Sequence, residues 1–372
     1  MNPRSRTLNA LKGQQVDRVP IYLQGLEFKT SEEIDNHPDP LRRKAAKEIF
    51  SRMTYNYSVP AHINRYLATP PQRIHTEEKP LDNGHVQIHQ TIDTPKGNLT
   101  AINERAPEAG TAWKVKYPVE TEEDLEKIAS VPWERPDTLG PPDLNDLPSD
   151  FSERGIVNTG ISSPFVCVAG MMSYQWFLEL ALTRRDMMLE LTEICRQRVL
   201  DALEALLSRP GIEHVWMGGS EWVTPPMGSP DLYDTFVQEQ ERSIIECIHS
   251  RSDATVQVHC HGNVRHALQR SIERGADYTE PVEPPPDGDI TMSEAKELSD
   301  GRITLGGNIE ARVLHREDEA TVEQAAGEAF EGGKHRFILR STEGPTPQMT
   351  EQEYRNYMRL IKVWEELSPV DG

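Results

Sequence analysis

His259 and His261 are the two residues of this sequence whose types and spacing point most directly to chemistry. They lie in the segment TVQVHCHGN, residues 255–263, just before a Gly-Asn pair that breaks the strand-like run. Because residues i and i+2 of a strand point to the same face, both imidazoles would project together and Cys260 would project away. Paired imidazole nitrogens suit Zn²⁺. The alternative is that both histidines only form hydrogen bonds at a strand end.

A third metal ligand would have to come from another segment. Glu343 lies just past the apolar segment 337–339, at the end of the last strand-like run. A His/His/Glu set leaves a fourth position open, which is typical of catalytic zinc. The sequence therefore predicts His259, His261 and Glu343 as ligands, although Glu343 could equally be an ordinary loop acid.

Other polar residues also follow strand-like segments. They are Glu221, Glu280, Glu283, Asn308 and Glu310. We expect Glu221 to act in catalysis by proton transfer. We expect substrate contacts from Glu280 and Asn308, and from Tyr22 and Gln24 near the first predicted strand. A structural role is the alternative for each of them.

The elements that must position these residues alternate between strand-like and helix-like patterns. Strand-like runs occur at 19–23, 155–161, 214–217, 255–259, 277–279, 303–305 and 336–339. Residues 176–207 form a long amphipathic pattern. Ser229-Pro230 is a typical helix start. Thr350 with Glu353 predicts a capping box for the last helix, which ends near Leu367.

This alternation predicts parallel strands joined by helices, in an α/β fold. We expect a (β/α)8 TIM barrel, whose active sites lie at the carboxyl ends of the strands. A doubly wound sheet is the alternative, but no GxGxxG motif follows a strand.

The segment near 74–118 has a different pattern. Residues 85–92 alternate with period 2, and Pro95-Lys96-Gly97 then turns the chain, which predicts an antiparallel hairpin insertion. His85 and His89 share its polar face, where we expect solvent rather than a metal. The Pro- and Asp-rich segment 132–148 is interpreted as a loop inside one domain that spans 1–372.

Composition excludes some classes of function. Acidic residues outnumber basic ones by 60 to 40, for a net charge of −20, which argues against a nucleic-acid surface. The first residues have no apolar core of a secretory signal, and no run reaches the 18 to 20 apolar residues of a membrane span. Four scattered cysteines without a CxxC motif favour a reducing cytoplasm.

Several segments, in this order, resemble the uroporphyrinogen decarboxylase superfamily. They are RSRTLNALKG at 4–13, DRVP at 17–20, HCHGN at 259–263, GAD at 275–277 and LGGNI at 305–309. The resemblance spans nearly the whole chain and implies a (β/α)8 barrel with its site at the carboxyl face.

The superfamily contains two chemistries. True decarboxylases carry an Arg-rich segment after the first strand, whereas residues 23–28 here contain no Arg, and Glu27 would repel a polycarboxylate. The other branch comprises zinc-dependent methyltransferases with a His-x-Cys motif and a late Cys. Here His259 and His261 match the first motif, and the neighbourhood of Glu343 matches the late Cys. Nitrogen and oxygen ligands leave more positive charge on zinc than thiolates do.

The resemblance thus implies an enzyme, a zinc-dependent methyltransferase that exchanges a methyl group between a small substrate and a corrinoid. The corrinoid would come on a partner protein, because DNHPDP at 35–40 has Pro where the corrinoid-binding motif needs Gly. A metal-free decarboxylase or lyase that uses acids such as Glu221 is the first alternative, and a non-catalytic binding barrel is the second. Nucleic acid and membrane are not expected partners, and homodimerisation is left open.

Overall fold

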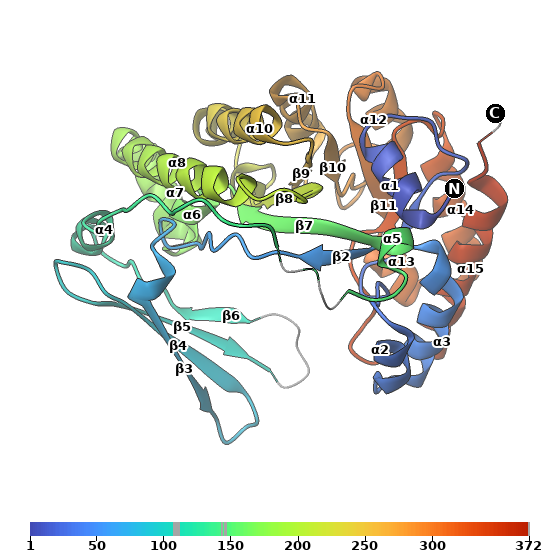
Figure 1. Cartoon of the computed structure of the whole chain (residues 1–372), viewed down its shortest axis with the longest axis horizontal. Coiled ribbons are helices and arrows are strands. Elements are labelled where there is room, and N and C mark those ends of the chain that lie inside the picture. Colours follow the sequence, from blue (N-terminus) through green and yellow to red (C-terminus); the bar gives the residue numbers. More distant parts are fainter. Residues whose placement is uncertain (107–111, 143, 145–146, 371–372) are drawn as a thin grey trace.

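A curled eight-stranded parallel sheet is the main feature of the computed structural model, which describes residues 1–106, 112–142, 144 and 147–370 (Figure 1). The strands stand in the order β1-β12-β11-β10-β9-β8-β7-β2. Their bounds are β1 Ile21–Tyr22, β2 Tyr55–Ser58, β7 Gly155–Ser162, β8 His214–Gly218, β9 Thr255–His259, β10 Tyr278–Glu280, β11 Thr304–Ile309 and β12 Phe337–Ser341.

All neighbouring strands of this sheet pair in parallel, and they follow one another in chain order around the curl. A doubly wound sheet would instead reverse its strand order at a switch point. The α/β fold with eight parallel strands is therefore confirmed. Closure into a complete barrel stays a prediction, because β1 and β2 form the two edges of the sheet in the described part of the chain.

Both faces of the curled sheet are buried, which explains its sequence pattern. On β9, Val256 and Val258 belong to the hydrophobic core, while Gln257 and His259 point to the inside of the curl. The sequence analysis placed the other seven strands but missed β2. Its sequence, YNYS, alternates Tyr with polar residues over only four positions and contains no aliphatic residue, and the strand stands at an edge of the sheet.

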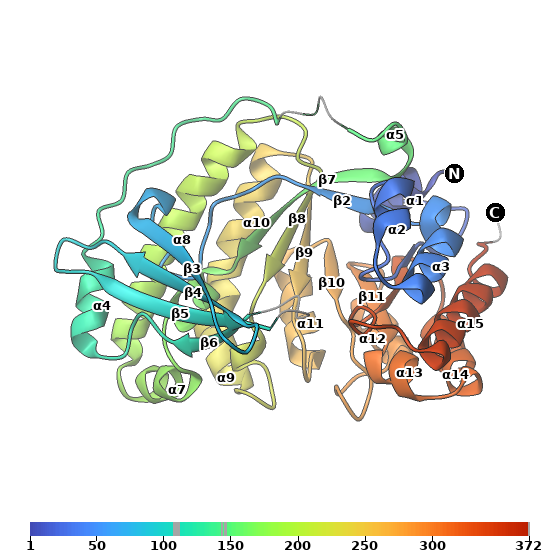
Figure 2. The same ribbon diagram turned by 90° about the horizontal axis from the view of Figure 1, so that it is seen from below.

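Helices follow most of the strands, and Figure 2 shows α8 and α10 beside β8 and β9. The helix bounds are α1 Pro3–Leu11, α2 Ser31–Asn36, α3 Pro40–Ile49, α4 Glu122–Ala129, α5 Phe151–Arg154, α6 Pro164–Ala169, α7 Tyr174–Thr183, α8 Arg185–Leu207, α9 Pro230–Tyr233, α10 Glu239–Arg251, α11 Arg265–Arg274, α12 Met292–Ser299, α13 Ala311–Arg316, α14 Glu319–Phe330 and α15 Glu351–Leu367.

The long amphipathic pattern over 176–207 does not form one continuous helix. The chain forms α7 and α8 instead, with Arg184 between them at φ −130° and ψ 41°. The hydroxyl of Thr183 also donates to the carbonyl of Glu179, which is a local bond that competes with helix continuation. The capping predictions are confirmed: Ser229 caps α9, and Thr350 forms a capping box with Glu353 at the start of α15.

The insertion between β2 and β7 is larger than the predicted hairpin. It forms a four-stranded antiparallel sheet of β3 Ile74–Pro80, β4 Val86–Ile92, β5 Leu99–Arg105 and β6 Trp113–Lys116, in that order. Figures 1 and 2 show this sheet near α4 and far from α14 and α15. Ile92, Leu99 and Ala101 anchor it, because they are part of the main hydrophobic core.

None of the helices that the structure describes is long and apolar enough to cross a membrane.

Candidate functional site

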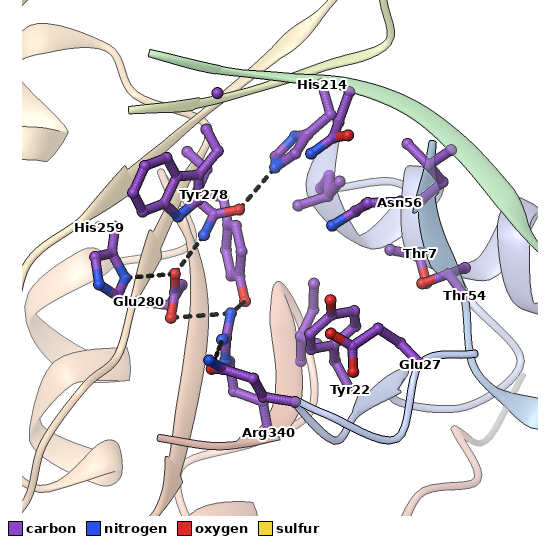
Figure 3. A pocket seen from close by; sticks show the side chains of 18 of the residues that line it. Thr7, Tyr22, Glu27, Thr54, Asn56, His214, His259, Tyr278, Glu280 and Arg340 are labelled. Carbon is purple, nitrogen blue, oxygen red and sulfur yellow. Dashed lines mark hydrogen bonds and ion pairs between the residues drawn. The ribbon is translucent and has the colours of Figure 1, made fainter. Parts of the chain in front are cut away.

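The inside of the curled sheet encloses a cavity of about 440 Å³ (Figure 3). Every strand of the sheet except β11 contributes lining residues, and Thr7 and Leu11 of α1 also line it. Residues two apart on one strand face the cavity together, as Gln257 and His259 do on β9. Polar side chains are interspersed with apolar and aromatic ones along the lining, so the cavity suits a ligand that has both an apolar body and hydrogen-bonding or charged groups.

A chain of buried hydrogen bonds crosses one wall of this cavity. His214 Nε2 lies 2.7 Å from Gln257 Oε1, and the amide of Gln257 donates to Glu280. Glu280 Oε1 is 2.8 Å from Nδ1 of His259. Burial lowers the pKa of His214. This wall is therefore a continuous polar network that ends at the His259 ring.

Arg340 is a positively charged residue in the same wall, and its charge is balanced by an ion pair with Glu280. Its Nη1 lies 2.9 Å from Glu280 Oε2, and its nitrogens also donate to the hydroxyl of Tyr278 and to Gln24 Oε1. Its guanidinium lies 5.3 Å from the ring centre of Tyr22. Although burial opposes ionisation, Arg340 and His259 lower the pKa of Glu280 to about 2.

A second carboxyl group, Glu27, lines the same cavity without such a partner. Burial raises its pKa, against hydrogen bonds from backbone amides and from Tyr22. Its Oε2 atom is buried and has no hydrogen-bond partner among the described residues. Burial also raises the pKa of Tyr22 well above its ordinary value. Glu27 therefore carries a carboxyl group that forms no ion pair with any residue the structure describes.

The predicted histidine pair lies at the carboxyl end of β9. The two rings are 4.7 Å apart, nearly perpendicular, and each Nδ1 is bonded to a carboxylate. For His259 the partner is Glu280, and for His261 it is Glu283 at 2.7 Å. Neither Nε2 has a hydrogen bond within the described ranges. Metal-binding histidines usually hold a carboxylate with the second ring nitrogen, and both rings make this contact.

Two turns bring these residues together. Gly219 has φ +109°, and the turn it allows after β8 leads directly to Glu221. Glu221 Oε1 lies 3.8 Å from Nε2 of His259. After His261 the chain turns at Gly262, with φ +103°, and its amide donates to Glu283 Oε2 at 2.6 Å. The structure thus places Glu221 beside the histidine pair.

Cys260 points away from the histidines, as the strand alternation predicts. Its Sγ lies 3.2 Å from the hydroxyl of Thr224, and burial raises the pKa of its thiol well above the ordinary value. The thiol is therefore a packed neutral group.

The structure does not bring Glu343 to the histidines. It lines a separate cavity of about 290 Å³ with Glu283, Asp287 and Glu310. Burial, together with Glu283 and Asp287, raises the pKa of Glu310 to about 8. Across the residues that the structure describes, no group of three or more His, Cys, Asp or Glu is arranged to hold a metal ion. Two imidazoles and the nearby carboxylate of Glu221 fit zinc by their chemistry, although the three side chains do not form a compact ligand set in this arrangement.

Three of the four residues predicted to contact the substrate line the main cavity, and one does not. Tyr22, Gln24 and Glu280 line the main cavity, whereas Asn308 does not, because β11 contributes nothing to the lining. The sequence analysis missed His214, Trp216, Gln257 and Arg340 as lining residues. Their signal was available, since Gln257 stands two residues before His259 and therefore faces the same side.

The comparisons with known proteins agree on a family and on a fold. Residues 146–364, more than half of the chain, match the sequence model described as uroporphyrinogen decarboxylase (URO-D). No curated protein matches the chain. A methyltransferase from Methanosarcina mazei has a similar structure, with a TM-score of 0.59, 16% identity, and coverage of 98% of this chain and 99% of that chain.

A second solved structure is similar at a lower level. It is a B12-independent methionine synthase from Shewanella sp. W3-18-1 in complex with selenomethionine, with a TM-score of 0.39 and 11% identity. The match covers 80% of this chain and 76% of that chain, and it is too weak to support an argument.

Proposed function

This chain belongs to the uroporphyrinogen decarboxylase family, and we propose that it is a zinc-dependent methyltransferase. In this proposal it moves a methyl group between a small substrate and a corrinoid that a partner protein carries. The observation that carries the proposal is the adjacent histidine pair with both Nδ1 atoms held by carboxylates. The fold shared with a methyltransferase supports it further.

His259 and His261 would hold the metal through Nε2, and Glu221 is our choice for the third ligand. Glu221 replaces Glu343 in that role because its Oε1 is 3.8 Å from His259 Nε2, whereas Glu343 lines another cavity. Together the three side chains would hold zinc as a His/His/Glu set, a ligand type that leaves a fourth position for a substrate. Glu280 and Glu283 act as positioning residues, because they fix the ring orientations.

When bound, zinc would supply Lewis acidity, which would stabilise a substrate thiolate or alkoxide as a methyl acceptor. In the reverse direction, the same Lewis acidity would stabilise the thiolate or alkoxide that leaves when the substrate gives up its methyl group. The chain's own residues bind and orient the substrate. The cavity next to His259 receives it, and Trp216, whose ring lies 5.2 Å from that of His259, shields one side of the site. Glu280 holds Nδ1 of His259 in place while the ring is used at Nε2.

The decarboxylase alternative has less support in the cavity. A substrate carboxylate needs a cation, and Arg340 is the only Lys or Arg among the described residues that line the cavity. Its guanidinium is engaged with Glu280, so it has no free pair of donors for a second carboxylate.

Metal content of the purified chain tests the proposal. We expect close to one zinc per chain in the wild-type protein and none in His259→Ala or His261→Ala. His89→Ala is the matched control, since His89 lies on the antiparallel sheet and bonds to Gln87. Methyl transfer to or from free cobalamin should be lost in the same two variants. A wild-type chain that binds no metal when purified without chelators would overturn the proposal.

A further inference from the structure

The carboxyl groups that line the main cavity outnumber the guanidinium and ammonium groups among the described residues. Its lining contains two carboxyl groups, Glu27 and Glu280, and one guanidinium, Arg340. Glu280 and Arg340 form an ion pair at 2.9 Å, and their charges cancel. Glu27 has no ion pair with any described residue. An ionised Glu27 would therefore leave the cavity with one unpaired negative charge.

We propose that this cavity selects a small cationic substrate, an amine or a quaternary ammonium, and that Glu27 holds its positive charge. The inference deepens the proposed function, because it names the substrate class of the same site. A buried carboxylate without a partner is costly, and a bound cation would supply the missing charge.

The rest of the lining suits such a ligand. The aromatic residues Tyr22, Trp216 and Tyr278 face the cavity, and aromatic rings attract ammonium groups. Tyr22 also donates a hydrogen bond to Glu27, which fixes the carboxyl group at the cavity wall. An anion, in contrast, would meet Glu27 and Glu280 and would find Arg340 already occupied.

The position of Glu27 also fits a substrate that reaches the histidines. Figure 3 shows Glu27 and His259 on opposite sides of the cavity, with Glu280 and Arg340 between them. A cavity of about 440 Å³ is large enough for a molecule of a few carbon atoms that is anchored at one end and reacts at the other.

Calorimetric titration with three probes of one shape tests the inference. Choline carries the cation, 3,3-dimethyl-1-butanol replaces its nitrogen with carbon, and 3,3-dimethylbutanoate is an anion. For the wild-type chain we expect choline to bind about tenfold more tightly than the alcohol, and the anion to bind most weakly. Glu27→Gln should make choline and the alcohol equal, and Glu27→Asp should keep the order.

Glu48→Gln is the control, because it removes one negative charge from an exposed position on α3. It should keep the wild-type preference. Thermal unfolding of each variant confirms that the chain is folded. Equal binding of choline and the alcohol by the wild-type chain, a preference that survives in Glu27→Gln, or no binding of any probe would each overturn the inference.

These titrations use no corrinoid and no methyl transfer, so they separate the two proposals. Choline preference in a chain that binds no zinc would support the cation site and would count against the zinc-dependent function. Zinc binding without choline preference would support the zinc-dependent function and would count against the cation site.

Discussion

Two pairs of histidines on single strands have very different surroundings in this molecule. His85 directly precedes β4 of the antiparallel sheet and His89 lies on it, whereas His259 ends β9 of the curled sheet and His261 follows two residues later. His85 bonds to Glu104, but His89 bonds to Gln87. At β9 both rings bond to carboxylates, and the side chain of Glu280 is 1% exposed. The comparison teaches that spacing alone does not distinguish the two histidine pairs, whereas two buried carboxylate partners set one pair apart from the other.

The largest expected effect comes from the carboxylate of Glu280. Glu280→Gln removes the partner of the buried Arg340, and we expect the free energy of unfolding to fall by about 3 to 5 kcal/mol, as for other broken buried pairs. Glu104→Gln, the matched change beside His85, should leave stability unchanged. Urea unfolding followed by circular dichroism measures both, and equal stabilities of the two variants would contradict the distinction.

The pH dependence of stability sharpens the same prediction. The pKa of Glu280 is lowered from 4.5 to about 2, so its contribution is complete above pH 4.5 and is lost as the pH falls toward 2. The wild-type chain should lose stability over this window, and Glu280→Gln should lose less.

An intermediate effect is expected for the carboxylate that orients the second ring. Glu283→Gln keeps the shape of the side chain but weakens its hold on Nδ1 of His261, and we expect zinc affinity to fall by about 10-fold to 100-fold. Competition with a chromogenic chelator measures this affinity. An unchanged affinity would show that Glu283 serves the fold and not a metal.

The smallest effect is expected for the pH dependence of cation binding. Burial raises the pKa of Glu27, so its ionised fraction grows as pH rises through a value above 4.5. The groups that act on its charge are Tyr22, Arg340 and Tyr357. Choline affinity should therefore rise by at most about tenfold per pH unit in this window and then level off. Calorimetry at several pH values would show this rise, and Glu27→Gln should give a flat profile.

The residues near the histidines show which features of the site could be predicted from the sequence and which could not. It placed β9, put His259 and His261 on one side, and turned Cys260 away, all of which follow from the two-residue period of a strand. It also predicted Glu280 and Glu283 as strand-end acids, but not that they are the partners of the two rings. It predicted Glu343 as a ligand because this residue follows the last strand and so should lie at the same edge of the sheet as the histidines. The side chain instead lines a neighbouring cavity.

Local sequence alone determined seven of the eight strands of the curled sheet, the two predicted helix caps and the alternating direction of the side chains on β9, because these depend on short-range periodicity and on hydrogen bonds between near neighbours. Only the tertiary structure decided that Glu280 forms an ion pair with Arg340, while Glu27 forms none with the residues that the structure describes. Those three residues come from β10, β12 and the segment after β1, so their distances depend on strand order and on the curl of the sheet. Charge balance in a cavity is therefore a property of the folded chain, and it is the property that points to a cationic ligand.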